Sequence, residues 1–207
     1  MASTTSSICV AFAALAALPA LTAGAARAAD TETIVLVRHG EKPANGLGQL
    51  SCKGLNRALA LPAVIAAKFG APNAVFAPDP SEQKKDGGDD YDYVRPLATI
   101  EPAAIAFGLP INADFGLNHT KKLRMALDDP KYRRALVVVA WEHNLIPKIA
   151  DKLIVHNGGE AGVAPKWNSD DYDGMYVVRV TRDGDKSAAS FERVTEGLDG
   201  QPAACPK

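Results

Sequence analysis

Short, continuous apolar runs recur along the chain and are separated by longer segments of mixed polarity. Three of these runs, "TIVLV", "NAVFA" and "ALVVVA", occupy residues 33–37, 73–77 and 135–140. A run of this length without polar alternation is typical of a strand that is buried on both faces of a parallel sheet. We therefore predict three central strands, of which the third has the strongest pattern.

Four longer segments carry helical features: residues 55–69, 95–107, 117–127 and 145–155. The first contains Pro62, which should kink the helix or start it afresh, and the second is followed by Gly108, a residue type common just past a helix end. Strands that alternate with helices of ten or more residues predict an α/β fold. The expected architecture is a three-layer sandwich, in which a mostly parallel central sheet carries helices on both faces.

Three further segments complete the pattern. Residues 111–115 are predicted to form an edge strand, and residues 174–194 to form two strands around the Asp-Gly turn at 183–184. The segment "PDPSEQKKDGGDDYDY" at residues 78–93 is dense in charge and glycine and almost lacks aliphatic side chains. We predict that it is a surface loop, excluded from the core, beside the helix that follows.

The first 28 residues differ in character from the rest. They contain the Ala- and Leu-rich run "ICVAFAALAALPALTAG" followed by "AARA", which offers a small-x-small cleavage site. This pattern is typical of a secretory signal peptide, although no Lys or Arg precedes the apolar run. A membrane anchor is the alternative, but Pro19, Thr22 and Gly24 keep the run short of the roughly 20 residues that a span needs. We predict a signal peptide over residues 1–28, a single domain over residues 29–207 and no stable membrane insertion after cleavage.

Composition and cysteine content limit the partners and the cellular location that we expect for this protein. The chain has 207 residues, 47% of them hydrophobic, which is enough for one sizeable core. Its net charge of −1 gives no reason to expect nucleic acid or an anionic membrane surface as a partner. After Cys9 leaves with the signal peptide, Cys52 and Cys205 remain. In an exported protein we expect them to form one disulfide, with two unpaired thiols as the alternative, and we expect a periplasmic or secreted location.

Polar clusters follow two of the predicted strands at the point where each strand ends. The strand at 33–37 runs into "RHGE" at residues 38–41, and the strongest strand runs into "WEHN" at residues 141–144. Ligands of open parallel sheets bind at the carboxyl ends of the strands. Two of the four histidines are therefore expected at one sheet edge, whereas His119 and His156 are predicted to be ordinary surface residues.

These residue types suit a phosphoryl group. Its transfer requires fixed cations around the non-bridging oxygens and a nucleophile in line with the leaving oxygen. Arg38 and Arg95 can supply bidentate contacts to those oxygens. His39 can attack through one ring nitrogen if a hydrogen bond keeps the other protonated. Gly40 would let the backbone pass close to the bound group, and His143 would donate to the developing charge.

The same residues lie in segments that resemble a known family. The segments are "LVRHGEKP", "LSCKGLNRA" at residues 50–58, "RPLATIEPAAIAFGLPI" at 95–111 and "VVVAWEHNLIPKIADKL" at 137–153. Together they resemble the histidine phosphatase superfamily, with its phosphoglycerate-mutase-like fold, and in particular its exported phosphatase-like members. The resemblance covers about residues 32–155. It implies catalytic or phosphate-binding roles for Arg38, His39, Arg95 and His143.

The proton donor to the leaving group is not fixed by these motifs. In the phosphoglycerate-mutase-like branch the resemblance implies a carboxylate downstream of the second arginine, where only Asp114 is present. The acid-phosphatase-like branch implies an Asp directly after the second histidine, where this chain has Asn144, which we take as a substrate-binding residue. As candidates for the proton donor, we rank Glu142 first, Asp114 second and Glu41 third. Glu142 needs a bend in the chain, because neighbours in a straight strand face opposite ways.

Each residue also has an ordinary structural explanation. Arg38 could pair with Glu41, Arg95 could pair with Asp92, and the two histidines could be buried structural residues. Together these explanations require four coincidences in the order that the family pattern has.

A divalent metal held by the same cluster is a further alternative, with His39, Glu41, Glu142 and His143 as ligands. The chain has no HxH, HExxH or CxxC spacing, and two arginines favour an anion over a cation. We therefore predict no metal and no cofactor.

Two other segments could border the pocket. Residues 78–93 lead directly to Arg95 and are the expected specificity element, in which Lys84 and Lys85 could meet an anionic substrate. In "KWNSDDYDGMYVV" a polar loop leading into a strand is expected, with Tyr172 or Asp173 closing the pocket as the alternative.

The sequence thus predicts a metal-independent phosphomonoesterase that acts on a phosphorylated small molecule through a phosphohistidine on His39. The alternatives are a phosphoglycerate-mutase-like phosphotransferase, a phosphohistidine-protein phosphatase and a non-catalytic module that binds a phospholigand. Neither the physiological substrate nor the oligomeric state follows from the sequence.

Overall fold

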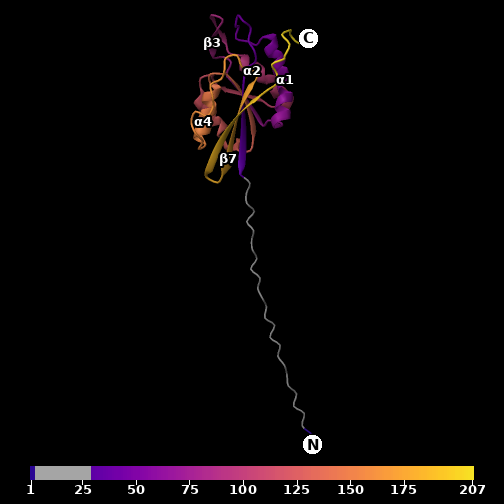
Figure 1. Ribbon diagram of the computed structural model, residues 1–207, viewed down its shortest axis with the longest axis vertical. Helices are drawn as coiled ribbons and strands as arrows, with labels where there is room; N and C mark the ends of the chain where they lie inside the picture. The colour runs from indigo at the N-terminus through magenta and orange to yellow at the C-terminus, as the bar shows by residue number, and fades with distance from the viewer. Residues whose placement is uncertain (3–28) are drawn as a thin grey trace.

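A computed structural model describes residues 1–2 and 29–207 of the chain (Figure 1). The signal peptide predicted over residues 1–28 lies outside the described residues, apart from residues 1–2. Among the helices of the described part, none is both long and apolar enough to cross a bilayer.

A six-stranded sheet forms the centre of the fold, in the order β5-β2-β6-β1-β7-β8. Strands β5, β2, β6 and β1 run parallel, whereas β7 and β8 are antiparallel to their neighbours. The sheet is therefore mostly parallel, as predicted, with β5 as an edge strand. The strand bounds are β1 Asp30–Arg38, β2 Ala74–Pro78, β5 Ile111–Phe115, β6 Leu136–Trp141, β7 Gly174–Asp183 and β8 Lys186–Thr195.

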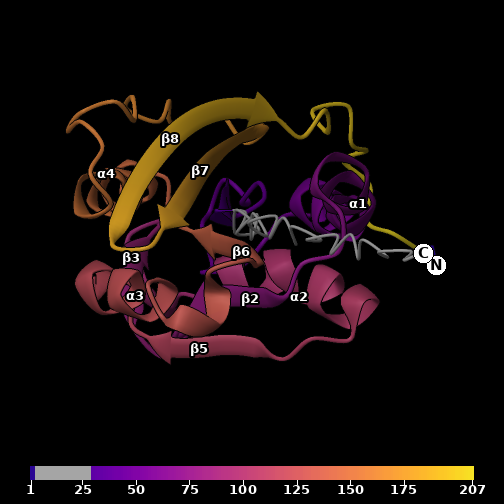
Figure 2. The same cartoon turned by 90° about the horizontal axis from the view of Figure 1, so that it is seen from below.

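Helices cover both faces of this sheet, which confirms the predicted three layers (Figure 2). One face carries α1 (Cys52–Phe69) and α2 (Arg95–Phe107). The other carries α3 (Thr120–Leu127) and α4 (Ile146–His156), with the short 3-10 helix η1 (Pro130–Tyr132) before β6.

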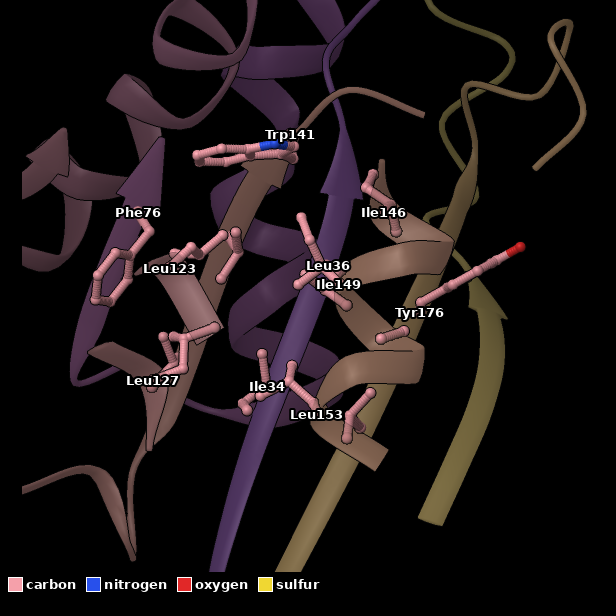
Figure 3. Packing of buried hydrophobic residues seen from close by; sticks show 14 of the residues in the cluster. Ile34, Leu36, Phe76, Leu123, Leu127, Trp141, Ile146, Ile149, Leu153 and Tyr176 are labelled. Atoms are coloured by element: carbon pink, nitrogen blue, oxygen red, sulfur yellow. The ribbon is translucent and has the colours of Figure 1, made fainter. Parts of the chain in front are cut away.

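Alternation along β1 divides its side chains between two hydrophobic cores. Ile34 and Leu36 pack toward α3 and α4 (Figure 3), whereas Val35 and Val37 pack toward α1 and α2. All four side chains are fully buried. Burial of a large aliphatic side chain contributes about 1.5–3 kcal/mol, so this strand is held from both sides and its carboxyl end is a fixed point of the fold.

Helix α1 differs from its prediction at both its start and its middle. It begins three residues earlier than expected, because the Ser51 side chain accepts a hydrogen bond from Gly54 N at 3.2 Å and caps the helix. It also continues through Pro62, so the expectation of a fresh start there is wrong. Burial of Leu61 and Ile65 on either side of the proline offsets the hydrogen bond that Pro62 cannot make.

The segment at residues 78–93 is not the loop that its composition predicted. It forms a two-stranded antiparallel hairpin of β3 (Gln83–Asp86) and β4 (Asp89–Asp92). Its turn is Gly87-Gly88, and both glycines have positive φ. The prediction that no part of the segment is buried is wrong as well, since Asp86 is 4% exposed and Tyr93 is 1% exposed.

Candidate active site

The carboxyl ends of β1 and β6 lie side by side in the middle of the sheet. Arg38 pairs in register with Trp141, and the backbone N–H of His39 donates to the carbonyl oxygen of Trp141 at 3.2 Å. The two polar clusters found in the sequence are therefore neighbours at one sheet edge. Helix α2, which begins at Arg95, adds its first residue to the same place.

His39 is buried in this cluster, with 3% of its surface exposed. Its Nδ1 lies 2.8 Å from the carbonyl oxygen of Gly40. Since a carbonyl oxygen can only accept, Nδ1 carries the proton and Nε2 keeps its lone pair in the neutral ring. The rings of Tyr93 and Tyr172 flank the imidazole, with centroids 5.8 and 6.2 Å away.

The surroundings of His39 also keep it uncharged. Burial and the nearby positive charges of Arg95 and Arg38 lower the pKa of His39 to about 3, against the opposite effect of the Gly40 hydrogen bond. At neutral pH the imidazole is therefore neutral. A buried neutral imidazole with a defined tautomer is the form that can act as a nucleophile.

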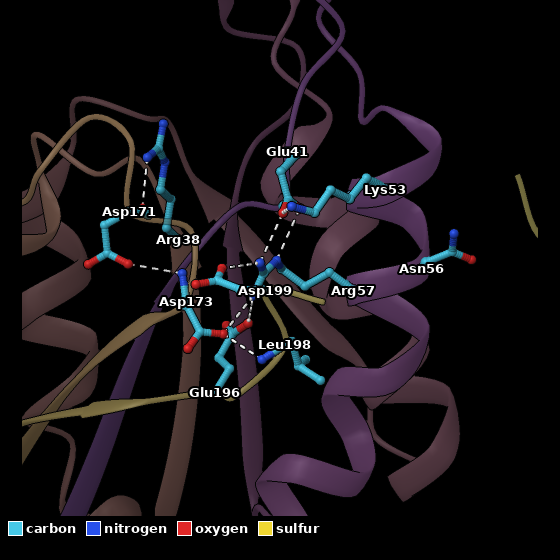
Figure 4. A network of polar contacts seen from close by, with 12 residues as sticks. Arg38, Glu41, Lys53, Asn56, Arg57, Asp171, Asp173, Glu196, Leu198 and Asp199 are labelled. Atoms are coloured by element: carbon cyan, nitrogen blue, oxygen red, sulfur yellow. Dashed lines mark hydrogen bonds and ion pairs between the residues drawn. The ribbon is translucent and has the colours of Figure 1, made fainter. Parts of the chain in front are cut away.

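Arg38 is held by backbone carbonyls and by an aromatic ring. Its Nη1 donates to the carbonyl oxygens of Ser169 at 2.6 Å and Asp171 at 2.8 Å (Figure 4), and its Cζ lies 3.7 Å from the ring centroid of Tyr172. The alternative in which Arg38 pairs with Glu41 is wrong. Neutral carbonyls position the guanidinium without cancelling its charge, which leaves that charge for an anion.

Arg95 is buried and forms an ion pair with Asp86 of the hairpin, not with Asp92. The other oxygen of Asp86 accepts from Lys42 Nζ at 2.6 Å. Asp86 is itself buried, and the two cations lower its pKa although burial raises it. The Cζ of Arg95 lies 4.7 Å from the ring centroid of Tyr93, which also contacts His39.

The chain bends directly after β6, as a role for Glu142 requires. The backbone N–H groups of Leu145 and Ile146 both donate to the carbonyl oxygen of Glu142, at 2.9 and 3.0 Å. The Glu142 carboxylate then lies 3.0 Å from His143 Nδ1 and accepts from Asn144 N at 3.0 Å and from Asn144 Nδ2 at 2.8 Å. Because of this bend, the side chains of Glu142 and His143 contact each other, whereas neighbours in a straight strand would face opposite ways.

These contacts fix the charge of Glu142. Burial alone would raise the pKa of this carboxyl, but the contacts with His143 and Asn144 and the charge of Lys84 lower it to about 2. Lys84 Nζ lies 3.3 Å from Glu142 Oε1. Glu142 is thus ionised at neutral pH and suits the orientation of His143 better than the donation of a proton.

The other two candidate acids are placed differently. Glu41 is engaged by Arg57, whose Nε and Nη2 donate to its two oxygens at 3.0 and 2.9 Å. Asp114 is exposed on the edge strand β5, where it accepts from Asn112, and β2 and β6 separate this strand from β1. Asp114 is therefore not brought to the cluster around His39.

Gly40 serves close packing of the backbone. A Cβ at this position would lie 2.8 Å from the carbonyl oxygen of Gly54 in α1, so no larger residue fits without a backbone shift. The Gly40 N–H donates to Thr99 Oγ1 at 2.9 Å, and that hydroxyl donates to the carbonyl oxygen of Arg95 at 2.8 Å. Gly40 thereby links the loop after β1 to both α1 and α2.

Arg57 was not expected from the sequence and is the centre of a polar network behind the site (Figure 4). Its guanidinium is fully buried and contacts four carboxylates, Glu41, Asp173, Glu196 and Asp199. Asp173 follows Tyr172, so the network extends to the segment that holds Arg38. The alternative in which Asp173 closes the pocket gives way to this structural role.

The C-terminal tail is tied to α1 beside this network. Cys52 and Cys205 form the predicted disulfide, with Cα atoms 4.5 Å apart. Asn56 Nδ2 donates to the carbonyl oxygens of Pro202 and Ala204 at 2.8 Å each. His119 and His156, by contrast, have side chains that are 51% and 54% exposed, as predicted for surface histidines.

Within residues 29–207, no three or more His, Cys, Asp or Glu side chains are grouped so that they could hold a metal ion. Lys42, Asp86 and Thr99 were missed as site residues. The uniformly polar sequence "QKKD" carries no signal for the burial of Asp86, which appears only in the structure.

The sequence matches no protein-family model and no curated protein sequence. Solved structures do resemble the chain. The structure named "Putative Phosphohistidine Phosphatase SixA" from Nakamurella multipartitia aligns with a TM-score of 0.54 at 14% sequence identity, over 80% of this chain and 95% of that one. A second, of the same printed name from Agrobacterium tumefaciens, aligns with a TM-score of 0.45 at 16% identity, over 78% of this chain and 97% of that one. The first of these alignments shows that the chain shares its fold with that structure.

Proposed function

We propose that this protein is a phosphatase that transfers a phosphoryl group from its substrate to His39 Nε2 and then to water. The observation that carries the proposal is the state of His39, which is buried and neutral, with Nδ1 bonded to the Gly40 carbonyl. This arrangement leaves Nε2 as the reactive atom, and the buried cations Arg38 and Arg95 stand beside it.

The arginines supply the binding of the phosphoryl oxygens. Both guanidinium groups are 3% exposed, and each keeps a buried Nε without a protein partner among the described residues. A desolvated guanidinium that retains donors favours an oxyanion, and two of them balance a phosphoryl dianion. His143, whose Nδ1 lies 3.0 Å from Glu142 Oε1, would donate from Nε2 to the same oxygens in its imidazolium form, in which both ring nitrogens carry a proton.

The reaction proceeds in two balanced steps. In the first, Nε2 of His39 forms a bond to phosphorus as the bond to the leaving oxygen breaks, and that oxygen takes up a proton. In the second, water attacks phosphorus and gives up a proton that replaces the one used in the first step, the N–P bond breaks, the lone pair returns to Nε2 and phosphate leaves. The Gly40 carbonyl stabilises the positive charge that the imidazole carries while phosphorylated.

A small phosphate monoester is the proposed substrate, handled without metal or cofactor in one domain over residues 29–207. The Cys52–Cys205 disulfide supports an oxidising compartment, and hence export with residues 1–28 as signal peptide. The fold shared with a structure named as a phosphatase supports the phosphatase class. The choice of a small phosphate monoester rests on the residues around His39.

A second candidate is the hydrolysis of phosphoramidates such as phosphohistidine on a protein. The observation that favours it is the ionised state of Glu142, with Glu41 engaged by Arg57 and Asp114 outside the cluster. Substrates whose leaving group departs readily have less need of an acid in the enzyme. The solved structure from Nakamurella multipartitia carries a phosphohistidine phosphatase name.

The test is hydrolysis of p-nitrophenyl phosphate and of a phosphohistidine peptide by the protein without residues 1–28, in the presence of EDTA. We expect turnover of the ester that His39→Ala abolishes and that His119→Ala, a matched change of an exposed histidine, leaves intact. Turnover of the peptide alone would favour the second candidate. Ester hydrolysis that persists in His39→Ala would contradict the mechanism.

A further inference from the structure

The β3–β4 hairpin presents two faces of different character beside the site. Along β3, Lys84 and Asp86 point inward, whereas Gln83 and Lys85 are exposed. This is the alternation expected of a strand that is covered on one side. Asp86 forms an ion pair with Arg95. Lys84 lies on the same face of β3 as Asp86, and its ammonium group has no such role in the site described so far.

Lys84 places its ammonium group next to the reactive ring. Its Nζ lies 3.3 Å from Glu142 Oε1 and 5.2 Å from the ring centroid of Tyr93. The Tyr93 ring in turn packs edge-on against His39, and the same Glu142 oxygen contacts His143 Nδ1 at 3.0 Å. The ammonium therefore stands over the residues that surround the phosphoryl position.

The position of Lys84 is both fixed and accessible. Its side chain is 35% exposed, so the ammonium can be reached from solvent. An ammonium has three N–H donors, and this one forms an ion pair with Glu142. The Glu142 carboxylate holds the Lys84 ammonium in place. Because the ammonium and the Asn144 hydrogen bonds keep Glu142 ionised, Glu142 cannot act as the acid.

We infer that Lys84 is the proton donor to the leaving group, a role that no carboxylate of the site fills. The inference rests on the proposed function and deepens it, because a built-in donor extends the substrates from activated esters to ordinary alkyl and aryl phosphates.

The proton balance closes over the two steps. As Nε2 of His39 bonds to phosphorus and the ester P–O bond breaks, Lys84 Nζ gives a proton to the leaving oxygen and becomes a neutral amine. In the second step the attacking water gives a proton back to that amine while the N–P bond breaks. Glu142 stays ionised throughout.

Leaving-group dependence tests this role more sharply than activity alone. For phenyl phosphate, which has a poor leaving group, Lys84→Met should lose about 100-fold in kcat/KM, the typical size of a general-acid contribution. For p-nitrophenyl phosphate, whose leaving group departs without a proton, the loss should stay below about tenfold. Lys68→Met, a change of an exposed lysine in the last turn of α1, should leave both values at the wild-type level.

Lys84→Arg separates the proton from the charge. A guanidinium keeps the positive charge beside Glu142 but does not release a proton at neutral pH. We therefore expect Lys84→Arg to show the same steep dependence on the leaving group as Lys84→Met. Full activity of Lys84→Arg on phenyl phosphate, or equal losses of Lys84→Met on both esters, would overturn the assignment. Absence of turnover by wild type on either ester would instead refute the proposed function on which it rests.

Discussion

The ring of Tyr172 lies against the guanidinium of Arg38, with Arg38 Cζ 3.7 Å from the ring centroid. The adjacent carbonyl oxygen of Asp171 accepts from the same guanidinium at 2.8 Å and also from Trp167 Nε1 at 2.9 Å. The segment that precedes β7 thus positions a side chain at the end of β1. The position of Arg38, which we propose binds the phosphoryl group, therefore depends on residues more than 130 positions away along the chain.

Tyr172→Leu should weaken the binding of vanadate, a mimic of the transferring group. A cation–π contact that is partly desolvated contributes about 1–2 kcal/mol, which corresponds to roughly five- to thirtyfold in the inhibition constant. Tyr172→Phe retains the ring and should bind vanadate as the wild type does. Equal weakening in both variants would assign the effect to the hydroxyl and not to the stacked ring.

Removal of Arg57 should destabilise the fold. Arg57→Met leaves Glu41, Asp173 and Glu196 facing one another without their buried cation, and loss of one partner of a buried ion cluster costs about 3–5 kcal/mol. Urea unfolding measures the change in free energy.

The control for this prediction is Arg179→Met, which removes an arginine paired with Glu192 on the exposed side of β7 and β8. A surface pair contributes at most about 1 kcal/mol. Similar losses in the two variants would show that the buried network does not have the stabilising role assigned to it.

Cys205→Ser should lower the melting temperature and leave the activity intact. The disulfide closes a loop with a sequence separation of 153, for which chain entropy sets an upper estimate of nearly 5 kcal/mol. The tail that it anchors contributes Asp199 to the Arg57 network but no residue to the phosphoryl position. Protein without residues 1–28, denatured in the absence of reductant, should show no thiol reactive with Ellman's reagent. Two reactive thiols per chain would contradict the bridge.

The parallel core and α2 could be predicted from the sequence because their signals are local. The strand at residues 33–37 is a continuous apolar run, and α2 has the predicted bounds 95–107, since Pro96 lies in its first turn and Gly108 ends it with φ 66°. The placement of Arg38, His39, Arg95 and His143 at one edge then follows from the topology of a parallel sheet.

The hairpin and the Arg57 network could not be predicted because their determinants are distant in sequence. "QKKD" and "DDYD" lack β-branched residues, and Asp86 is buried only because Lys42 and Arg95 neutralise it. Arg57 meets Asp173, Glu196 and Asp199 across 116, 139 and 142 residues, so no spacing rule relates them. The burial of charge at both places is a product of tertiary contacts.

The imidazole of His39 should remain neutral as the pH falls from 8 to 5. Its pKa is lowered to about 3, so the proton that ordinarily binds near pH 6.5 binds only in much stronger acid. Imidazole nitrogen chemical shifts, assigned by comparison with His39→Ala, report the state of this ring directly. A signal from His39 that moves to the imidazolium position between pH 7 and 6 would refute the neutral nucleophile.

The most direct measurement of the central claim is the capture of the phosphoryl group on the protein. Wild type is mixed with p-nitrophenyl phosphate, quenched within milliseconds in base, where phosphoramidates persist, and digested for mass spectrometry. The account predicts one phosphoryl group per chain, on the peptide that contains His39, and none in His39→Ala treated in the same way. A phosphoryl group on any other residue, or turnover of the ester with none captured at all, would contradict it.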